Sequence, residues 1–248
     1  MNDADPKTGR LRLLGLPLDA QNLTQAADQI EGWIVARHPR TVVTLNPEIL
    51  VQSDTDALLK QSIEKADLVT PDGIGILWAA KTLLRKRLPE RVSGIDLTVR
   101  LLERGGRNLR VFYLGGKPGV ADRAAQRMLA RYGTISVGTQ HGYFSDTEAK
   151  AIAQAIRFSQ PHLLLTALGA GRQECFNEQF RAEMQVPVSM GVGGTLDVLA
   201  GMVARAPQWT SRLGMEWAWR ILTGKRWGRF PRLFRFVSKV RRAKRLKR

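Results

Sequence analysis

The feature that most constrains the fold is a regular alternation of short apolar runs with longer amphipathic segments. The runs are β-branched and short, as in Thr-Val-Val-Thr-Leu (41–45), and several end in polar or glycine-rich turns. The longer segments repeat apolar residues three and four positions apart, as at 23, 26, 27, 30, 33 and 34. This alternation predicts an α/β fold with a mostly parallel, Rossmann-like sheet and helices on both faces. A first strand or hairpin arm is expected at 11–18, and strands are expected at 41–45, 66–70, 109–114, 135–139, 161–168 and 186–190.

Composition places the chain among ordinary globular proteins that work in a reducing compartment. Its 248 residues are 44% hydrophobic and 25% charged, enough to bury a core. The single Cys175 excludes an internal disulfide framework and a cysteine-rich metal site. No secretory signal is visible, and no apolar run approaches the roughly 18 to 20 residues that span a bilayer. These features predict a cytoplasmic location.

The positive charge is concentrated at the C-terminal end. Residues 212–248 hold 14 Lys and Arg and one acid, Glu216, so they carry +13 of the net +17. The charge change divides the chain into a catalytic domain at 1–205 and a basic, aromatic-rich helical appendage at 206–248. In helical register Phe234, Phe236 and Val240 fall opposite basic side chains, a pattern typical of an interfacial helix on anionic lipid. Nucleic acid is the alternative partner, which the clustered Trp and Phe disfavour.

Asp72 lies where a catalytic carboxylate would be expected. It follows the apolar run 66–70 and Pro71, which lacks an N–H and ends the strand. Gly73 and Gly75 then lead into a helix, so Asp72 lies on a strand-to-helix turn, where open α/β sheets bind ligands. The alternative is that Asp72 only caps that helix.

Two glycine-rich turns are candidates for binding a diphosphate. Gly115 and Gly116 open the turn Gly-Gly-Lys-Pro-Gly (115–119) between a predicted strand and helix, where backbone N–H groups favour an anion. The turn Gly-Val-Gly-Gly (191–194) is a partial match of the same kind. Neither turn has the spacing of a Walker A loop or a dinucleotide fingerprint, which disfavours a nucleotide-dependent oxidoreductase. Each turn could also be a plain connection.

No metal site is predicted, and no cofactor is expected. Asp-Thr-Asp (54–56) resembles the metal-binding DxD of sugar-nucleotide transferases, but it lies in or beside a predicted helix and is interpreted as solvated carboxylates. The histidines His38, His141 and His162 lack the spacing of metal ligands.

Eight motifs in order closely resemble the WecG/TagA/CpsF family of bacterial glycosyltransferases, glycosyltransferase family 26, over roughly residues 10–237. The family implies inverting, metal-independent transfer of a hexose from a UDP-sugar to an undecaprenyl-diphosphate-linked sugar, in cell-surface polysaccharide assembly. N-acetylmannosamine, its uronic acid and glucose are all transferred among relatives. The motifs are Thr-Leu-Asn-Pro-Glu (44–48), Pro-Asp-Gly-Ile-Gly (71–75), Arg-Val-Ser-Gly-Ile-Asp (91–96), Leu-Gly-Gly-Lys-Pro-Gly (114–119), Gly-Tyr-Phe (142–144), Gly-Ala-Gly-Arg-Gln-Glu (169–174), Gly-Val-Gly-Gly-Thr-Leu-Asp (191–197) and Arg-Ala-Pro with Gly-Met-Glu-Trp and an arginine (205–220).

The resemblance also implies roles for individual residues. Asp72 matches the catalytic base, and Thr44, Asn46 and Gln173 match polar residues of the same pocket. Arg220 matches an arginine that reaches the lipid diphosphate. The matching substrate-binding positions are Arg91, Gly115, Gly116, Tyr143, Gly169, Gly191, Gly193, Gly194, Asp197, Arg226 and Arg229.

The expected partners follow from the same resemblance. They are a UDP-sugar donor, a lipid-diphosphate-linked sugar acceptor and the anionic inner face of the cell membrane, with a homo-oligomer possible and no nucleic acid expected. Many relatives have Gly-Ala-Pro-Lys-Gln-Glu where this chain has Gly-Ala-Gly-Arg-Gln-Glu (169–174), which predicts a looser local backbone. Residues 238–248 are an extra basic extension to which no catalytic role is transferred.

Overall fold

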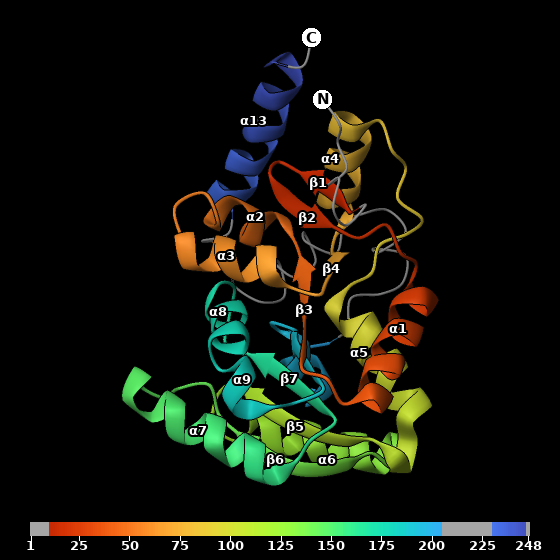
Figure 1. The fold of residues 1–248 in the computed structure, drawn as a ribbon, viewed down its shortest axis with the longest axis vertical. Coiled ribbons are helices and arrows are strands. Elements are labelled where there is room, and N and C mark those ends of the chain that lie inside the picture. Colours follow the sequence, from red (N-terminus) through yellow and green to blue (C-terminus); the bar gives the residue numbers. More distant parts are fainter. Residues whose placement is uncertain (1–9, 205–229, 247–248) are drawn as a thin grey trace.

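A six-stranded parallel sheet forms the centre of the computed structural model, which describes residues 10–204 and 230–246 (Figure 1). Every strand pair in this sheet is parallel, which confirms the fold class predicted from the alternating pattern. Across the sheet the strands are β4 (Leu68–Pro71), β3 (Arg40–Leu45), β8 (Val188–Gly191), β7 (Leu163–Ala167), β5 (Arg110–Gly115) and β6 (Ile135–Gln140).

Helices cover both faces of the sheet because successive strand residues point to opposite sides. Val42 packs with α1 and α5, whereas its neighbour Val43 packs with α2, α3 and α4. One face carries α1 (Leu23–Ala36), α5 (Gly94–Gly105), α6 (Val120–Tyr132) and α10 (Thr195–Leu199). The other carries α2 (Pro47–Gln52), α3 (Ala57–Lys65), α4 (Ile74–Leu84), α7 (Asp146–Ser159), α8 (Arg172–Gln179) and α9 (Arg181–Met184).

The segment 11–18, expected as a first strand or hairpin arm, forms a complete hairpin, β1 (Leu11–Leu13) and β2 (Leu16–Leu18). Its two turn residues, Leu14 and Gly15, both have positive φ, the conformation that two-residue hairpins of type I′ require. The four leucines at the hairpin's strand ends are buried in the same core as α3 and α4. The hairpin therefore covers the edge of the fold beside β4.

The Asp-Thr-Asp motif lies between two helices, α2 and α3. The chain turns at 53–56 between α2 and α3, and the Asp56 carboxylate accepts the Leu59 N–H at 2.9 Å as the cap of α3. Asp54 pairs with Lys239. The Asp-Thr-Asp motif (54–56) thus has structural partners rather than only solvent, because one carboxylate is needed to begin the new helix.

The C-terminal helix α13 (Phe230–Leu246) packs on α2 and α4. Phe236 is 1% exposed and its ring meets Trp78 edge-on at 6.3 Å, and Val240 is fully buried. Arg232 pairs with Glu48 of α2. The apolar stripe of α13, which was expected to face lipid, is therefore covered by α2 and α4. Helical periodicity predicts that an apolar stripe exists, but it does not show what covers the stripe.

Phe234 lies off the buried stripe of α13. The helical register predicts that it lies with Phe236 on the apolar side of the helix, but Phe234 is 72% exposed.

None of the helices in the described part of the chain is long and apolar enough to cross a membrane. The division of the chain at residue 205 stays a prediction, since 205–229 lie outside the described residues.

Candidate active site

A pocket of about 650 Å³ lies at the carboxyl edge of the sheet. β3 leads to β4 at one edge and β5 leads to β6 on the other side, with β8 and β7 between them. The loops that leave β3 and β5 therefore diverge, which is the arrangement that opens a ligand crevice in parallel sheets. Residues in or after all six strands line this pocket.

Asp72 lines the pocket directly after β4, and its backbone N–H donates to Leu45 O of β3 at 2.8 Å. The capping alternative does not hold, because the cap position of α4 is Gly73, with φ of +93°, and has no side-chain capping bond. Glu48, in the first turn of α2, is a second carboxylate in the lining. The end of the pocket above β4 and β3 is thus acidic.

Thr44 and Asn46 are held in place by bonds within the fold. The Thr44 hydroxyl donates to Gly191 O of β8 at 3.1 Å and is buried. The Asn46 Oδ1 accepts the Glu48 and Ile49 N–H groups at 2.9 and 3.1 Å, so Asn46 is the cap of α2. Both residues line the pocket, with side chains whose orientation is fixed.

The glycine-rich turn after β5 forms part of the opposite wall. Gly115 has φ of +130°, and a Cβ there would lie 2.3 Å from Ala167 O, so only glycine fits against β7. Gly116 donates its N–H to that same oxygen at 3.1 Å. Gly116 and Lys117 line the pocket beside the start of α6, and diphosphate binding by this turn stays a prediction.

Arg172 fixes the loop that follows β6. Its Nη1 and Nη2 donate to Gly142 O and Phe144 O at 2.8 and 2.6 Å, and its guanidinium lies 4.4 Å from the Phe144 ring centroid. Between these two anchors is Tyr143, which is exposed in the pocket lining. The bidentate contact needs the planar guanidinium and would not be reproduced by lysine.

Gly171 separates this chain from relatives with proline in the same motif. Its φ is +88°, whereas proline fixes φ near −65°. Proline could not adopt this backbone conformation, and a Cβ at Gly171 would lie 2.3 Å from the Gln52 side chain. The backbone here is a tightly packed turn.

Gln173 joins two loops at the floor of the pocket. It is 2% exposed, and its Oε1 accepts the Gly193 N–H at 3.0 Å. The amide of Gly193 is consequently engaged within the protein. The second glycine-rich turn contributes Gly193 and Gly194 to the pocket lining, followed by Asp197 of α10.

Most sequence-predicted site residues that the structure describes lie together. The pocket lining includes Thr44, Asn46, Asp72, Gly116, Tyr143, Gly169, Gln173, Gly193, Gly194 and Asp197. Gly115 and Gly191 end strands β5 and β8 just beneath it. Arg91 instead pairs with Asp96 at 2.7 Å and is not among the lining residues. Arg220, Arg226 and Arg229 lie outside the described residues.

Sequence reasoning assigned no role to three charged lining residues, Glu48, Lys117 and Arg172. All three stand inside quoted motifs, so the signal was present, but their roles depend on neighbours from distant segments.

Within residues 10–204 and 230–246, no group of three or more His, Cys, Asp or Glu side chains is placed to hold a metal. His162 lies at the opposite edge of the sheet, where burial and then Arg37 and Arg110 lower its pKa.

The comparison with known families agrees with this geometry. The family model described as the glycosyl transferase WecG/TagA/CpsF family matches residues 11–248, nearly the entire chain. The chain therefore belongs to the WecG/TagA/CpsF family of glycosyltransferases.

Proposed function

We propose that this glycosyltransferase moves a hexose from a UDP-sugar to an undecaprenyl-diphosphate-linked sugar, with inversion and without a metal ion. The observation that carries the proposal is the charge division of the pocket. Asp72 and Glu48 stand at the end above β4 and β3, and Lys117 and Arg172 stand at the end above β5 and β7. A third carboxylate of the lining, Asp197, follows the central strand β8. A transferase of this class needs both: a base for the acceptor hydroxyl and positive charge for a diphosphate.

The proposed step is a single displacement at the anomeric carbon. The acceptor hydroxyl oxygen forms the new bond to this carbon, and its proton passes to the Asp72 carboxylate. The bond between the anomeric carbon and the diphosphate oxygen breaks on the opposite face, and UDP leaves with the electron pair. Asp72 suits the base role because it is partly buried and held by the β4–α4 turn.

The leaving diphosphate needs stabilisation where its negative charge develops. The Gly116 N–H is engaged with Ala167 O. Lys117 and the start of α6, whose cap position Gly119 has no side-chain capping bond, are the described groups that offer a cation and backbone amides there. Tyr143, held by Arg172, is the proposed contact to the uracil or ribose. Arg220, Arg226 and Arg229 are proposed to reach the lipid diphosphate of the acceptor.

The test is a panel of UDP-sugars offered with a short-chain prenyl-diphosphate-linked GlcNAc or glucose, with and without EDTA. We expect one donor to be used, with an unchanged rate in EDTA, since the cations of the pocket replace a metal. Product formation is followed by mass spectrometry, and the anomeric configuration by NMR. Transfer that stops in EDTA would overturn the metal-independent mechanism. Absence of transfer together with absence of UDP binding in calorimetry would overturn the proposed donor class.

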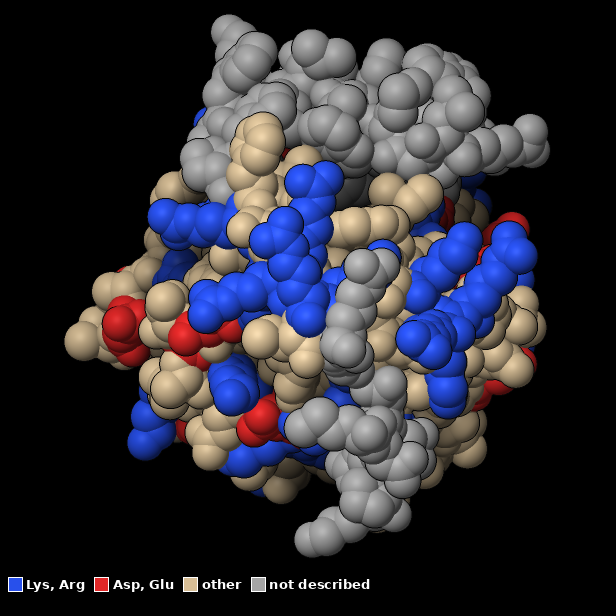
Figure 2. Space-filling model, turned by 90° about the horizontal axis from the view of Figure 1, so that it is seen from above, with Lys and Arg blue, Asp and Glu red and all other residues tan. Residues whose placement is uncertain are grey.

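The anionic inner face of the cell membrane is the second proposed partner. Figure 2 views the molecule from the end that carries α13 and α4, and lysine and arginine side chains cover much of its described surface. Exposed apolar side chains, Ile74, Trp78 and Phe234, belong to the same two helices. Asp72 directly precedes α4, so contact at this end would bring the pocket near a lipid-linked acceptor. The exposed cations are Lys81, Arg85, Lys86, Arg87, Arg232, Arg235, Arg241, Arg242, Lys244 and Arg245.

Vesicle sedimentation tests this partner. The chain is expected to sediment with phosphatidylglycerol-containing vesicles at low salt, and to be released at high salt, because the attraction is screened. Phosphatidylcholine vesicles are the control and should retain little protein. Equal retention by both vesicles would contradict the proposal. If the protein binds an oligonucleotide in a salt-sensitive way and sediments with neither kind of vesicle, the result would favour the nucleic-acid alternative.

A further inference from the structure

Glu174 is a buried carboxylate that bonds to the amide at the floor of the pocket. It is 2% exposed, and its Oε1 accepts from Gln173 Nε2 at 2.7 Å. Its Oε2 accepts the Gly171 N–H at 2.8 Å. Consecutive residues of a helix do not normally face each other, so the bond between Gln173 and Glu174 is a special feature of the first turn of α8.

The bonds form a chain from one loop to another. Glu174 connects Gly171, in the β7–α8 turn, to Gln173, and Gln173 connects to Gly193, in the β8–α10 loop. Gly191 packs against this series of hydrogen bonds, because a Cβ at this position would lie 2.9 Å from both Gln173 Nε2 and Glu174 Oε1. Helix capping explains only the Gly171 bond.

We propose that Glu174 is a positioning residue that orients the Gln173 amide for the donor sugar nucleotide. An ionised carboxylate only accepts, so it requires Gln173 to present Nε2 and leaves Oε1 for the Gly193 N–H. A protonated carboxyl is a weaker acceptor and can itself donate, so it no longer selects one amide orientation. The inference rests on the proposed function for its catalytic consequence, but the bonding pattern itself does not.

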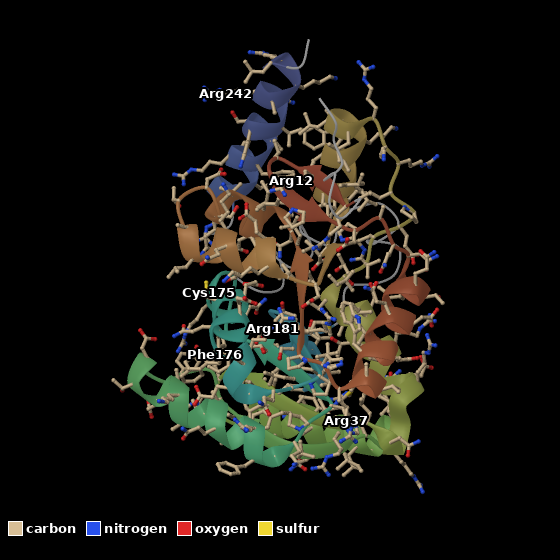
Figure 3. All side chains as sticks on the ribbon, in the orientation of Figure 1. Arg12, Arg37, Cys175, Phe176, Arg181 and Arg242 are labelled. Atoms are coloured by element: carbon tan, nitrogen blue, oxygen red, sulfur yellow. The ribbon has the colours of Figure 1, made fainter. Side chains whose placement is uncertain are left out.

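The surroundings of Glu174 make its charge state sensitive near neutrality. Burial raises the pKa of Glu174 to about 7, and the charge of Glu48 on α2 acts in the same direction. Strands β7 and β8, which pack against α8, contain no titratable side chain. Figure 3 shows Cys175 on the α3 side of α8 and Phe176 toward α7. The other charged neighbours are engaged elsewhere: Glu178 with Lys65 and Arg181, and Arg40 with Asp67.

The expected pH dependence follows from that direction. Between pH 6 and 8 the ionised fraction of a group with a pKa near 7 rises about tenfold, and kcat/KM should rise by a similar factor. Stability should change in the opposite sense. The pKa of Glu174 is higher in the folded protein than in the unfolded chain, so the unfolded chain releases this proton at lower pH. The contribution of Glu174 to the free energy of unfolding is therefore fully present at acid pH and is lost as pH rises through about 7.

The experiment compares the full chain with the isosteric Glu174→Gln variant. Its amide can accept only one of the two bonds without placing Nε2 against another donor, so the Gln173 amide loses its fixed orientation. We expect kcat/KM at pH 8 to fall about tenfold and the rise between pH 6 and 8 to disappear. The fall of melting temperature over that range should become smaller too.

Glu178→Gln is the matched control, since it makes the same change one turn later in α8, outside the pocket lining. It should retain the wild-type pH profile. An NMR titration of the Gln173 side-chain amide in the wild-type chain gives a readout that needs neither a variant nor activity. Its resonances should move with an apparent pKa near 7, and a flat titration would overturn the inference even if transfer is observed. A normal titration without transfer would instead count against the proposed function alone.

Discussion

Replacing Asp72 with asparagine is expected to lower kcat by about 10²- to 10⁴-fold while leaving UDP affinity unchanged, the loss typical of removing a general base. The amide keeps the size of the carboxylate and fits the same turn between β4 and α4, so the fold should persist. The substitution removes the carboxylate that is proposed to take the acceptor proton. Initial rates over a range of acceptor concentrations give kcat, and titration calorimetry gives the UDP affinity.

Glu48 is the carboxylate to compare with Asp72, because it lines the same pocket. Its carboxylate is engaged in an ion pair with Arg232 of α13, which leaves it less accessible to the acceptor hydroxyl. Glu48→Gln should therefore cost less than Asp72→Asn. A near-normal rate in Asp72→Asn, with the loss appearing in Glu48→Gln, would reassign the base.

Truncating Phe236 to alanine is expected to cost about 3–5 kcal/mol of unfolding free energy, the usual range for a large aromatic removed from a core. The side chain is 1% exposed and lies against Trp78 and the first turn of α4. Such a loss is a large part of the roughly 5–15 kcal/mol that a domain possesses. Transfer should also weaken, since α4 begins two residues after Asp72. Denaturant unfolding followed by circular dichroism measures the stability.

Phe234→Ala is the matched control for Phe236→Ala. Both residues belong to α13 and undergo the same change, but Phe234 is 72% exposed. Its truncation should change the unfolding free energy by less than about 0.5 kcal/mol. Equal losses in the two variants would mean that α13 does not pack through Phe236.

The sequence was sufficient to predict the elements and the edge of the sheet that carries the site. Strand-ending turns at Asp72, Gly116 and Gly193 were visible as breaks in apolar runs, and parallel strands bring such turns to one edge. The order of the strands was not predictable in this way, because β8 pairs with β3 through residues as distant in sequence as Arg40 and Val188. Such pairings depend on tertiary packing rather than on local pattern.

Motif matches did not show which contacts the side chains make within the fold. Arg91 pairs with Asp96, and a motif match cannot distinguish that ion pair from a ligand contact. Arg172 was seen only as a departure from the family, although it holds the backbone of residues 142 and 144. The apolar stripe of α13 was correctly located at Phe236 and Val240, but its covering by α2 and α4 required the fold.

The central position of β8 has a consequence for how the enzyme is assembled during synthesis. β8 is the last strand of the sheet to leave the ribosome, yet it lies between the pair β4–β3 and the trio β7–β5–β6. Before residues 188–191 emerge, the two parts share no strand pairing. The acidic end of the pocket belongs to the first part and the basic end to the second. A nascent chain therefore cannot bring the proposed base and the proposed diphosphate-binding cations of the pocket together through the sheet until synthesis of the sheet is complete.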